Sequence, residues 1–270
     1  MQTLKQESLK NYTSFKIGGP ADIYLPETIP EFIDLLKEYP QAFILGGGTK
    51  MLFPDEGLVL PVILTSKLNK IEETPQGIQV ECGYRISHIF DFAAGIPVTA
   101  GGALYYNFGA FGHELCSFVD KVRIISSKED KWLFRKDLFF NYRESSLKEN
   151  HQIIAEVIFN KKQLSHTKSF LHLRQEKQPL KFPSAGSVFK NPQGNYAGKL
   201  IEACGLKGLK DGDAEIWEKH ANFIINKGQA SCQNVKSLVK KIQESVKEKF
   251  GIMLELELEI YGAKDHDLKI

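Results

Sequence analysis

Two glycine-rich stretches of the chain could bind phosphate through their backbone. The first is Gly46-Gly47-Gly48-Thr49, and the second extends from Gly95 to Gly112. Because glycine lacks a Cβ, several backbone N–H groups can converge there on an anion that larger side chains would obstruct. Neither stretch is a Walker loop, since Thr49 precedes Lys50 instead of following a Gly-Lys pair, and no GxGxxG opens a helix. Tight structural turns therefore remain an alternative for both.

A serine among small residues could donate a proton. Ser187 lies in the segment Pro183–Pro192 (PSAGSVFKNP), with a lysine and an asparagine three and four positions later. Its small neighbours could leave the hydroxyl open to a ligand. The segment lacks the GxSxG pattern of a hydrolase nucleophile, so we interpret Ser187 as a proton donor or a hydrogen-bonding group. A plain turn serine is the alternative on spacing alone.

Two charged residues could stabilise charge in a reaction. Arg143 follows an aromatic residue in Tyr142-Arg143-Glu144-Ser145, and Glu257 is the middle glutamate of the segment Leu254–Ile260. The plain alternative for Arg143 is a surface ion pair, which contributes little to stability. The plain alternative for Glu257 is a solvated carboxylate on a strand. Neither residue justifies a catalytic role when it is considered singly.

Hydrophobic periodicity predicts the elements that position the first glycine stretch. Pro30 suits the first turn of a helix, and the apolar residues that follow it lie at helical spacing. The short apolar run Ala42–Leu45 predicts a buried strand that leads directly into Gly46, and Ala21–Leu25 predicts another strand. Helix, strand and glycine loop in this order are typical of a ligand site.

The rest of the chain predicts mixed helix and strand. Strand-like runs occupy Val122–Ile125 and Ile153–Phe159, and a polar stretch over Lys161–Lys168 marks a domain boundary. Apolar residues from Val235 to Phe250 recur at helical spacing, with Ser231 near the start of this helix and Gly251 placed to end it. Strict alternation over Leu254–Ile260 predicts a strand with its leucines on one face and its glutamates on the other.

Composition excludes several classes of protein. The 270 residues are 42% hydrophobic and 25% charged, which is typical of a globular chain. A net charge of +2 from dispersed basic residues argues against a nucleic-acid partner. The four cysteines lack paired spacing, so we expect buried free thiols and no metal site. With no signal peptide and no apolar run long enough to span a bilayer, we expect a cytoplasmic protein without membrane insertion.

Taken in order, these segments resemble the UDP-N-acetylenolpyruvoylglucosamine reductase family over nearly the whole chain. The matching landmarks are Asn11–Asp22, Leu45–Thr49, Ala94–Pro97, Ala100–Ala103, Asn107–Gly112, Asn141–Ser145, the Ser187 segment, Ala197–Glu202, His220–Asn226 and Leu254–Glu257. The resemblance implies an α+β fold, with an FAD-binding domain of the PCMH or vanillyl-alcohol-oxidase type at 1–162. A smaller α+β substrate-binding domain would follow at 163–270, and its C-terminal strand would return to the active site. The chain is more similar to the shorter branch of the family.

The resemblance also implies a reaction in cell-wall peptidoglycan precursor synthesis. NADPH would reduce bound FAD, and the enolpyruvyl group of UDP-N-acetylglucosamine enolpyruvate would then accept hydride on its methylene carbon. The catalytic residues carried over are Ser187 as proton donor, with Arg143 and Glu257 stabilising the enolate-like intermediate. Glu257 would have to donate a hydrogen bond in a protonated state, or else orient a neighbouring group.

The same resemblance assigns the binding residues. Those expected to bind FAD are Gly46, Gly47, Gly48, Thr49, Ala100, Gly101, Gly102, Asn107, Gly109 and Ala110. Those expected to bind the substrate are Tyr142, Lys177, Asn191 and His220. No metal is implied, and a monomer is the expected state.

Some positions depart from the family pattern. Val98-Thr99 stands where a glycine and a small residue are common, Lys50 replaces a frequent asparagine, and Glu259 occupies a position that is often basic. The stretch from Gly83 to Ala94 is short. Two other functions stay open: an FAD-dependent oxidase of the same superfamily, and a non-catalytic protein that binds flavin or nucleotide sugar.

Overall fold

The described residues divide into two compact units built from separate chain segments. The structure is a computed structural model that describes residues 1–160 and 169–261. The first unit comprises 1–5, 22–47 and 60–172, and the second comprises 6–21, 48–59 and the described residues from 173 onward. The domain boundary expected at residue 162 lies outside the described residues. Two segments before residue 60 therefore belong to the C-terminal unit. No single boundary along the chain separates the two units.

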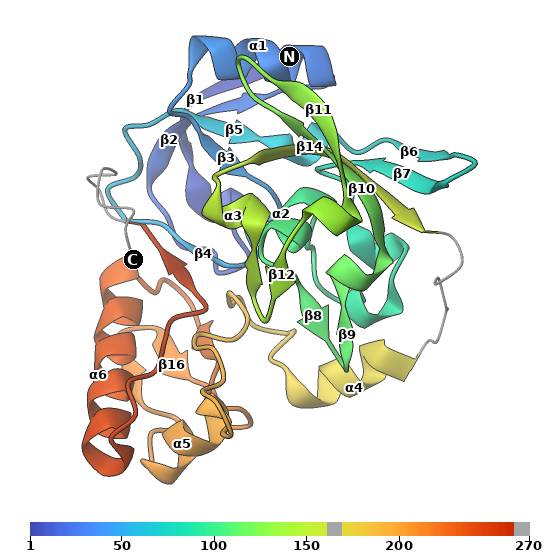
Figure 1. Ribbon diagram of the computed structural model, residues 1–270. Coiled ribbons are helices and arrows are strands. Elements are labelled where there is room, and N and C mark those ends of the chain that lie inside the picture. The colour runs from blue at the N-terminus through green and yellow to red at the C-terminus, as the bar shows by residue number, and fades with distance from the viewer. Residues whose placement is uncertain (161–168, 262–270) are drawn as a thin grey trace. The chain divides into compact units, whose positions relative to one another are not determined.

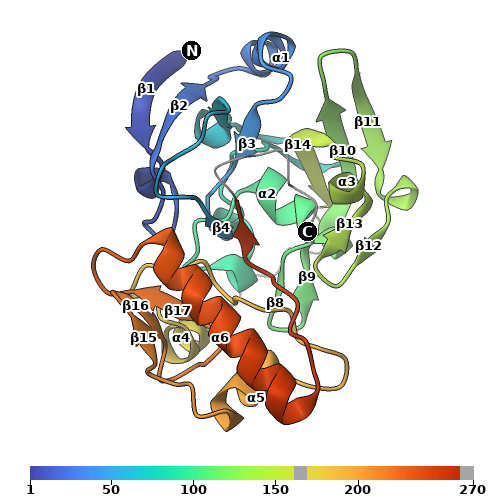
Figure 2. The ribbon, with the colours of Figure 1, turned by 90° about the vertical axis from the view of Figure 1, so that its left-hand side faces the viewer.

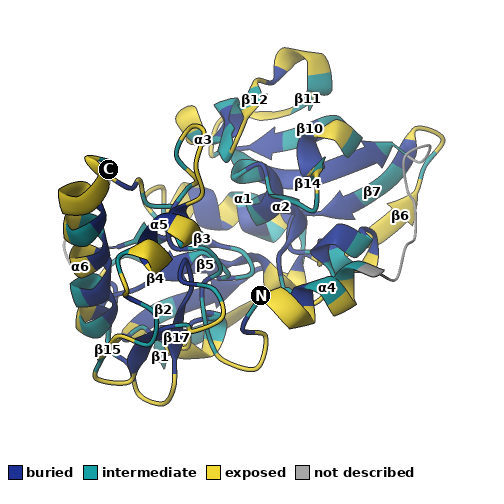
Figure 3. Ribbon diagram, turned by 90° about the horizontal axis from the view of Figure 1, so that it is seen from below, coloured by how far each residue is buried: buried dark blue, intermediate teal, exposed yellow. Residues whose placement is uncertain are grey.

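A five-stranded antiparallel sheet forms one part of the first unit (Figure 1). Its strands, in spatial order, are β11 (Asp130–Phe134), β10 (Val119–Ile125), β14 (Ile153–Asn160), β7 (Gly77–Glu81) and β6 (Ile71–Glu73). The central strand β14 is buried along almost its whole length, whereas the edge strand β6 is exposed (Figure 3). A nearly continuous apolar run is what a strand covered on both faces requires. The strands predicted at Val122–Ile125 and Ile153–Phe159 are confirmed.

A second sheet of the first unit leads into the glycine loop. Its spatial order is β1 (Gln2–Ser8), β2 (Pro20–Leu25), β5 (Val62–Leu64) and β3 (Phe43–Leu45). Helix α1 (Ile29–Glu38) connects β2 to β3, and the Thr28 side chain caps it by accepting from the Glu31 N–H. Phe32, Leu35 and Leu36 are buried. Both parts of this prediction, the helix and the strand before Gly46, are confirmed.

Short elements complete the first unit and its links to the second. The hairpins are β8 (Gly109–Ala110) with β9 (His113–Glu114), and β12 (Phe140–Asn141) with β13 (Glu144–Ser145). The short helices are α2 (Ala100–Tyr105), α3 (Ser146–Glu149), α4 (Ser169–Lys177), η1 (Leu9–Tyr12), η2 (Thr65–Lys67), η3 (Ile86–His88), η4 (Asp91–Ala93), η5 (Leu115–Phe118) and η6 (Arg135–Asp137). The short stretch from Gly83 to Ala94 thus contains only single turns of 3₁₀ helix, η3 and η4.

The second unit packs helices against a small antiparallel sheet. The sheet contains β15 (Lys210–Asp211), β16 (Ala214–Ile216) and β17 (Ile224–Asn226), and the helices are α5 (Ala197–Ala203) and α6 (Cys232–Phe250). Figure 2 shows α6 lying along this sheet. Ser231 and Asn234 form a capping box at the start of α6, and Gly251 ends it with a left-handed φ of 69°. The predicted helix and both of its end signals are confirmed.

The strand predicted over Leu254–Ile260 is largely wrong. Only β18 (Glu259–Ile260) is a strand, parallel to β4 (Met51–Leu52), and Leu256 forms an isolated bridge to Phe189. The N–H groups of both Glu257 and Leu258 donate to the carbonyl of Val188, at 2.8 and 3.0 Å. Successive N–H groups of a regular strand point in opposite directions, so this shared acceptor requires a kink. As a result Leu256 is half-buried and Glu257 is not on a solvated face.

The architecture therefore confirms an α+β fold. Among the residues that the structure describes, no helix is both long enough and apolar enough to cross a membrane.

Candidate active site

The two glycine stretches approach each other inside the first unit. A Cβ on Gly46 would lie 2.6 Å from Oγ1 of Thr99, and a Cβ on Gly47 would lie 2.2 Å from the carbonyl oxygen of Pro97. Both distances are too short for any side chain, so the glycines are required by this close approach and not by a turn alone. The loop after β3 and the loop before α2 thus form one cradle lined by backbone.

A buried hydroxyl in this cradle has no hydrogen-bond partner among the described residues. Thr99 is 4% exposed, its Oγ1 makes no hydrogen bond there, and it does not cap α2 although it occupies the N-cap position. Buried polar groups are nearly always satisfied, so this hydroxyl would be stabilised by an acceptor on a bound ligand or an ordered water. A phosphate oxygen is one acceptor of the right kind, so the cradle and the hydroxyl are compatible with the diphosphate of FAD that the family resemblance implies.

The other residues expected at the flavin lie in α2 and in the chain that follows it. Ala100 and Gly101 are buried at the start of α2, and a Cβ on Gly101 would lie 2.9 Å from Cβ of Cys82. A Cβ on Gly102 would lie 3.4 Å from Oγ1 of Thr99. Gly109 and Ala110 form β8. Ala100, Gly101 and Gly102 thus lie at the start of α2, whereas Gly109 and Ala110 lie in a hairpin after its end.

Asn107 has a structural task that the sequence did not indicate. It is 1% exposed and has a positive φ of 42°. Its Nδ2 donates to the carbonyl of Asn141 at 2.9 Å, and its Oδ1 accepts from the N–H of Cys116 at 3.4 Å. The side chain therefore anchors the β12–β13 hairpin.

Arg143 lies in the tight turn of that hairpin. Asn141 pairs with Glu144, so Tyr142 and Arg143 are the two central turn residues. Arg143 has a φ of 61°, a left-handed conformation that glycine or asparagine normally supplies. Backbone strain of this kind is enriched at functional sites, which agrees with the role expected for Arg143. Tyr142 is 41% exposed and its ring lies 5.3 Å from the Arg143 guanidinium.

The second unit brings Ser187 and Glu257 to neighbouring strands of backbone. Ser187 forms an isolated bridge with Phe223, and the next residue, Val188, donates its N–H to Asn222. On its other side, the carbonyl of Val188 accepts the N–H of Glu257 at 2.8 Å. Glu257 is thus one backbone hydrogen bond away from the residue that follows Ser187. A separation of 70 positions in sequence becomes adjacency in the fold.

The end of the first glycine loop joins the same region of the second unit. The N–H of Ser14 donates to the carbonyl of Gly48 at 3.0 Å, and the Ser14 hydroxyl donates to the carbonyl of Ser184 at 2.7 Å. A Cβ on Gly48 would lie 2.1 Å from the carbonyl oxygen of Tyr12. Thr49, the next residue, is half-buried. The opening segment around Ser14 therefore ties Gly48 to the segment that carries Ser187.

Glu257 is paired with a cation in this unit. The Nζ atom of Lys50 donates to Oε1 of Glu257 at 3.3 Å, and the two side chains are 17% and 11% exposed. The plain alternative of a solvated strand carboxylate is wrong, because the Glu257 side chain is only 11% exposed.

The expected substrate residues of the second unit differ in exposure. Lys177 is exposed at the end of α4. Oδ1 of Asn191 accepts the N–H of Ala197 at 3.1 Å, so part of this side chain holds the start of α5. His220 accepts the Asn222 N–H on Nδ1 at 3.3 Å, and burial lowers its pKa. We therefore infer that the His220 ring is neutral and carries its proton on Nε2.

Comparison with known proteins decides the family. Residues 178–261 match the model described as UDP-N-acetylenolpyruvoylglucosamine reductase, C-terminal domain. The UDP-N-acetylenolpyruvoylglucosamine reductase of Thermotoga maritima is 40% identical over 280 residues, which cover 94% of this chain and 97% of that protein. The corresponding protein of Caldanaerobacter subterraneus subsp. tengcongensis is also 40% identical, with 96% and 93% covered. The chain belongs to the UDP-N-acetylenolpyruvoylglucosamine reductase family.

A solved structure of this reductase family agrees with the sequence matches. The crystal structure of UDP-N-acetylenolpyruvylglucosamine reductase from Thermus caldophilus aligns with a TM-score of 0.81 at 31% identity. The alignment covers 97% of this chain and 100% of that one. The family resemblance inferred from ordered motifs is therefore confirmed.

Sequence reasoning within this reductase family missed two residues. Thr99 and Lys50 were noted only as departures, although both lie in direct contact with expected site residues. For Thr99, the available signal was a hydroxyl directly before Ala100-Gly101-Gly102. For Lys50, no local signal existed, because its partner Glu257 lies 207 positions away.

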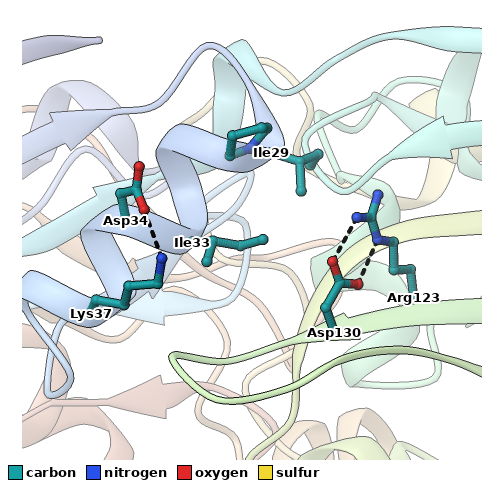
Figure 4. A pocket seen from close by; sticks show the side chains of 7 residues that line it. Ile29, Ile33, Asp34, Lys37, Arg123 and Asp130 are labelled. Atoms are coloured by element: carbon teal, nitrogen blue, oxygen red, sulfur yellow. Dashed lines mark hydrogen bonds and ion pairs between the residues drawn. The ribbon is translucent and has the colours of Figure 1, made fainter.

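A surface pocket of about 300 Å³ on the first unit contains none of the expected reductase residues. It is lined by α1 residues and by Arg123 and Asp130, which form a bidentate ion pair (Figure 4).

Proposed function

We propose that this protein is a flavoenzyme that uses NADPH to reduce UDP-N-acetylglucosamine enolpyruvate to UDP-N-acetylmuramate, a step of peptidoglycan precursor synthesis. The observation that carries the proposal is the backbone hydrogen bond between Glu257 and Val188, the residue after Ser187. It brings the two expected catalytic residues to adjoining backbone in a chain of this reductase family. A proton donor and a charged group are what reduction of an enolpyruvyl double bond needs, beside a hydride source.

When bound, FAD would supply the hydride, obtained from NADPH, that adds to the methylene carbon of the enolpyruvyl group. The residues that would hold its diphosphate are those of the glycine cradle, with the Thr99 hydroxyl as a donor. Backbone N–H groups and a hydroxyl are well suited to phosphate oxygens.

The chain's own side chains would act on the substrate. Hydride addition places negative charge on the carbon next to the carboxylate, and the guanidinium of Arg143 would stabilise that charge. Glu257 would orient a neighbouring group. Ser187 would then deliver a proton to this carbon, so that one hydride and one proton are added across the double bond. A free serine is a weak acid, so its surroundings must assist this transfer.

Four further residues would hold the substrate. The exposed ammonium of Lys177 suits the nucleotide diphosphate as a point charge, and the amide of Asn191 suits the substrate carboxylate or diphosphate. His220 would contribute a hydrogen bond from a neutral ring, because burial lowers its pKa. Tyr142, exposed beside Arg143, would contact the substrate through its ring or hydroxyl.

The assignment of domains follows from these roles. We propose that residues 1–162 chiefly bind FAD and that 163–270 chiefly bind the substrate. Monomeric action in the cytoplasm, without nucleic acid or membrane insertion, completes the proposal.

Anaerobic stopped-flow absorbance tests the function. The FAD-loaded protein is reduced with NADPH and then mixed with UDP-N-acetylglucosamine enolpyruvate. We expect the yellow band to bleach and then to recover quickly. For Ser187→Ala, bleaching should stay within about twofold of wild type, whereas recovery should slow by about 100-fold or more, the usual contribution of a positioned proton donor. Ser184→Ala, a matched change in the same segment, should behave as wild type.

Other outcomes would redirect the proposal. Equal slowing of both half-reactions in Ser187→Ala would remove the proton-donor role. Bleaching that only air reverses would favour the oxidase, and failure to retain FAD would favour a binding protein without turnover.

A further inference from the structure

Lys50 and Glu257 form an ion pair within the second unit that backbone contacts hold from both sides. The Nζ and Oε1 atoms lie 3.3 Å apart. The carbonyl of Lys50 accepts the N–H of Glu259 at 2.9 Å, and β4 pairs with β18 immediately after it. On the other side, the N–H of Glu257 donates to Val188. These hydrogen bonds fix the backbone positions of both residues.

The low exposure of both side chains distinguishes this ion pair from one on the protein surface. The two side chains are 17% and 11% exposed, whereas exposed ion pairs are screened by water and contribute little. When one partner of a desolvated pair is removed, the other is left as an uncompensated charge. Of the neighbouring glutamates, Glu255 is mostly exposed and pairs with Lys190 at 3.6 Å. Lys50 is thus paired with the glutamate of this segment that is expected at the reaction, and the side chain of that glutamate is only 11% exposed.

The direction of the hydrogen bond bears on how Glu257 works. A glutamate at this position either donates a hydrogen bond in its protonated state or orients a neighbour as a carboxylate. Here Oε1 of Glu257 accepts from the Lys50 ammonium, which suits a carboxylate, so Lys50 is a group that fixes the orientation of Glu257. Charge-assisted hydrogen bonds of this kind fix orientation strongly.

We propose that Lys50 is a positioning residue for the reduction of the enolpyruvyl group, and that its ammonium holds the Glu257 carboxylate in its working orientation. This inference rests on the proposed function, since it takes Glu257 to act on the substrate. Lys50 follows the glycine loop directly in sequence, so the competing role is a contact to the flavin diphosphate. The two roles affect different half-reactions and can be separated.

The test compares half-reactions in variants of the FAD-loaded protein. Lys50→Met keeps the stem and removes the charge, and Lys50→Arg keeps the charge. In anaerobic stopped flow, we expect Lys50→Met to be reduced by NADPH within about twofold of wild type. Its reoxidation by the enolpyruvyl substrate should slow by about tenfold or more, and Lys50→Arg should restore most of that rate. The FAD dissociation constant should change less than threefold.

A double variant adds a readout that a merely structural role would not give. Glu257→Gln should slow reoxidation by itself, and Lys50→Met should add little to it, because both residues act through one pair. Independent, multiplying effects of the two changes would overturn the proposal. A tenfold loss of FAD affinity in Lys50→Met, with reoxidation unchanged once FAD is saturating, would assign Lys50 to the flavin and would also overturn it.

The wild-type control separates this inference from the function on which it rests. If the reduced wild-type protein is not reoxidised by the substrate, the proposed function fails. If wild type is reoxidised and Lys50→Met matches it, only the role of Lys50 fails. Circular dichroism and the melting temperature of each variant establish that it is folded, and Lys50→Gln replaces Lys50→Met if the latter does not fold.

Discussion

The hydroxyl of Thr99 is the first candidate for a direct hydrogen bond to the cofactor, and this role can be tested. It is buried beside Gly46 and Gly102, and the described residues give it no hydrogen-bond partner. Without a ligand, burial of that hydroxyl costs free energy. With a phosphate oxygen as acceptor, the same hydroxyl contributes a hydrogen bond to a charged group, which is typically the stronger kind. A bound diphosphate would therefore offset the cost of burying the Thr99 hydroxyl.

We predict opposite effects of Thr99→Val on stability and on cofactor binding. Valine has nearly the same shape, so the unfolding free energy of the flavin-free protein should be unchanged or higher by about 1 kcal/mol. The FAD dissociation constant should rise about tenfold or more, because a hydrogen bond to a charged group contributes ~1.5–3 kcal/mol. Fluorescence titration of FAD and urea unfolding measure the two quantities.

Thr99→Ser is the matched control, because it keeps the hydroxyl and removes a methyl group. It should bind FAD within about threefold of wild type. An unchanged FAD dissociation constant in Thr99→Val would remove Thr99 from the cofactor site.

Among the elements, the β12–β13 hairpin is built around a strained turn. Arg143 occupies it with a φ of 61°, while the side chain of Asn107 holds the hairpin at the carbonyl of Asn141. A non-glycine residue in this conformation costs roughly 1–2 kcal/mol. In spite of this cost, the turn of the hairpin contains the guanidinium of Arg143, which supports the role proposed for this residue.

We predict that two substitutions of Arg143 will separate strain from chemistry. Arg143→Asn and Arg143→Gln both remove the charge, so both should slow reoxidation by the enolpyruvyl substrate to a similar extent. Asparagine tolerates the left-handed conformation and glutamine does not, so Arg143→Asn should be more stable by about 1 kcal/mol. Thermal unfolding and stopped-flow absorbance measure the two effects. Equal stability of the variants would mean that the turn relaxes and stores no strain.

Helix α6 and the segment after it show which elements a sequence can predict. The apolar spacing of α6, its Ser231 cap and its Gly251 end are all local, and each proved correct. The alternation over Leu254–Ile260 was equally clear but failed, because two N–H groups share the carbonyl of Val188. That acceptor lies on a distant segment, and no local pattern reports it.

At the scale of the whole molecule, burial of thiols affects stability in alkali. Burial raises the pKa of Cys82 to about 12 and that of Cys232 to about 11, from an ordinary value of 9.0. Below pH 9 the folded and unfolded chains both keep these protons. Above it the unfolded chain loses them first, so the stabilising contribution declines as pH rises from about 9 toward 11 and 12.

We predict that Cys82→Ala will weaken this alkaline dependence. Between about pH 8 and pH 10, the unfolding free energy of wild type should fall by about 1 kcal/mol more than that of the variant. Urea unfolding at the two pH values measures the difference, and comparing slopes removes the cost of the cavity that the alanine leaves. Identical pH dependence in the two proteins would mean that Cys82 ionises normally in the folded chain.

The sequence by itself determined the family, the α+β class, the well-formed helices and the residue types of the candidate site. These follow from local periodicity, end signals and the order of short motifs, and all of these are carried by neighbouring residues. The tertiary structure decided what depends on distant contacts: the pair of Lys50 with Glu257, the adjacency of Ser187 and Glu257, and the unpartnered hydroxyl of Thr99. It also placed two early segments in the C-terminal unit. The physical reason is that hydrogen bonds and ion pairs between segments up to 211 residues apart leave no periodic trace in the chain.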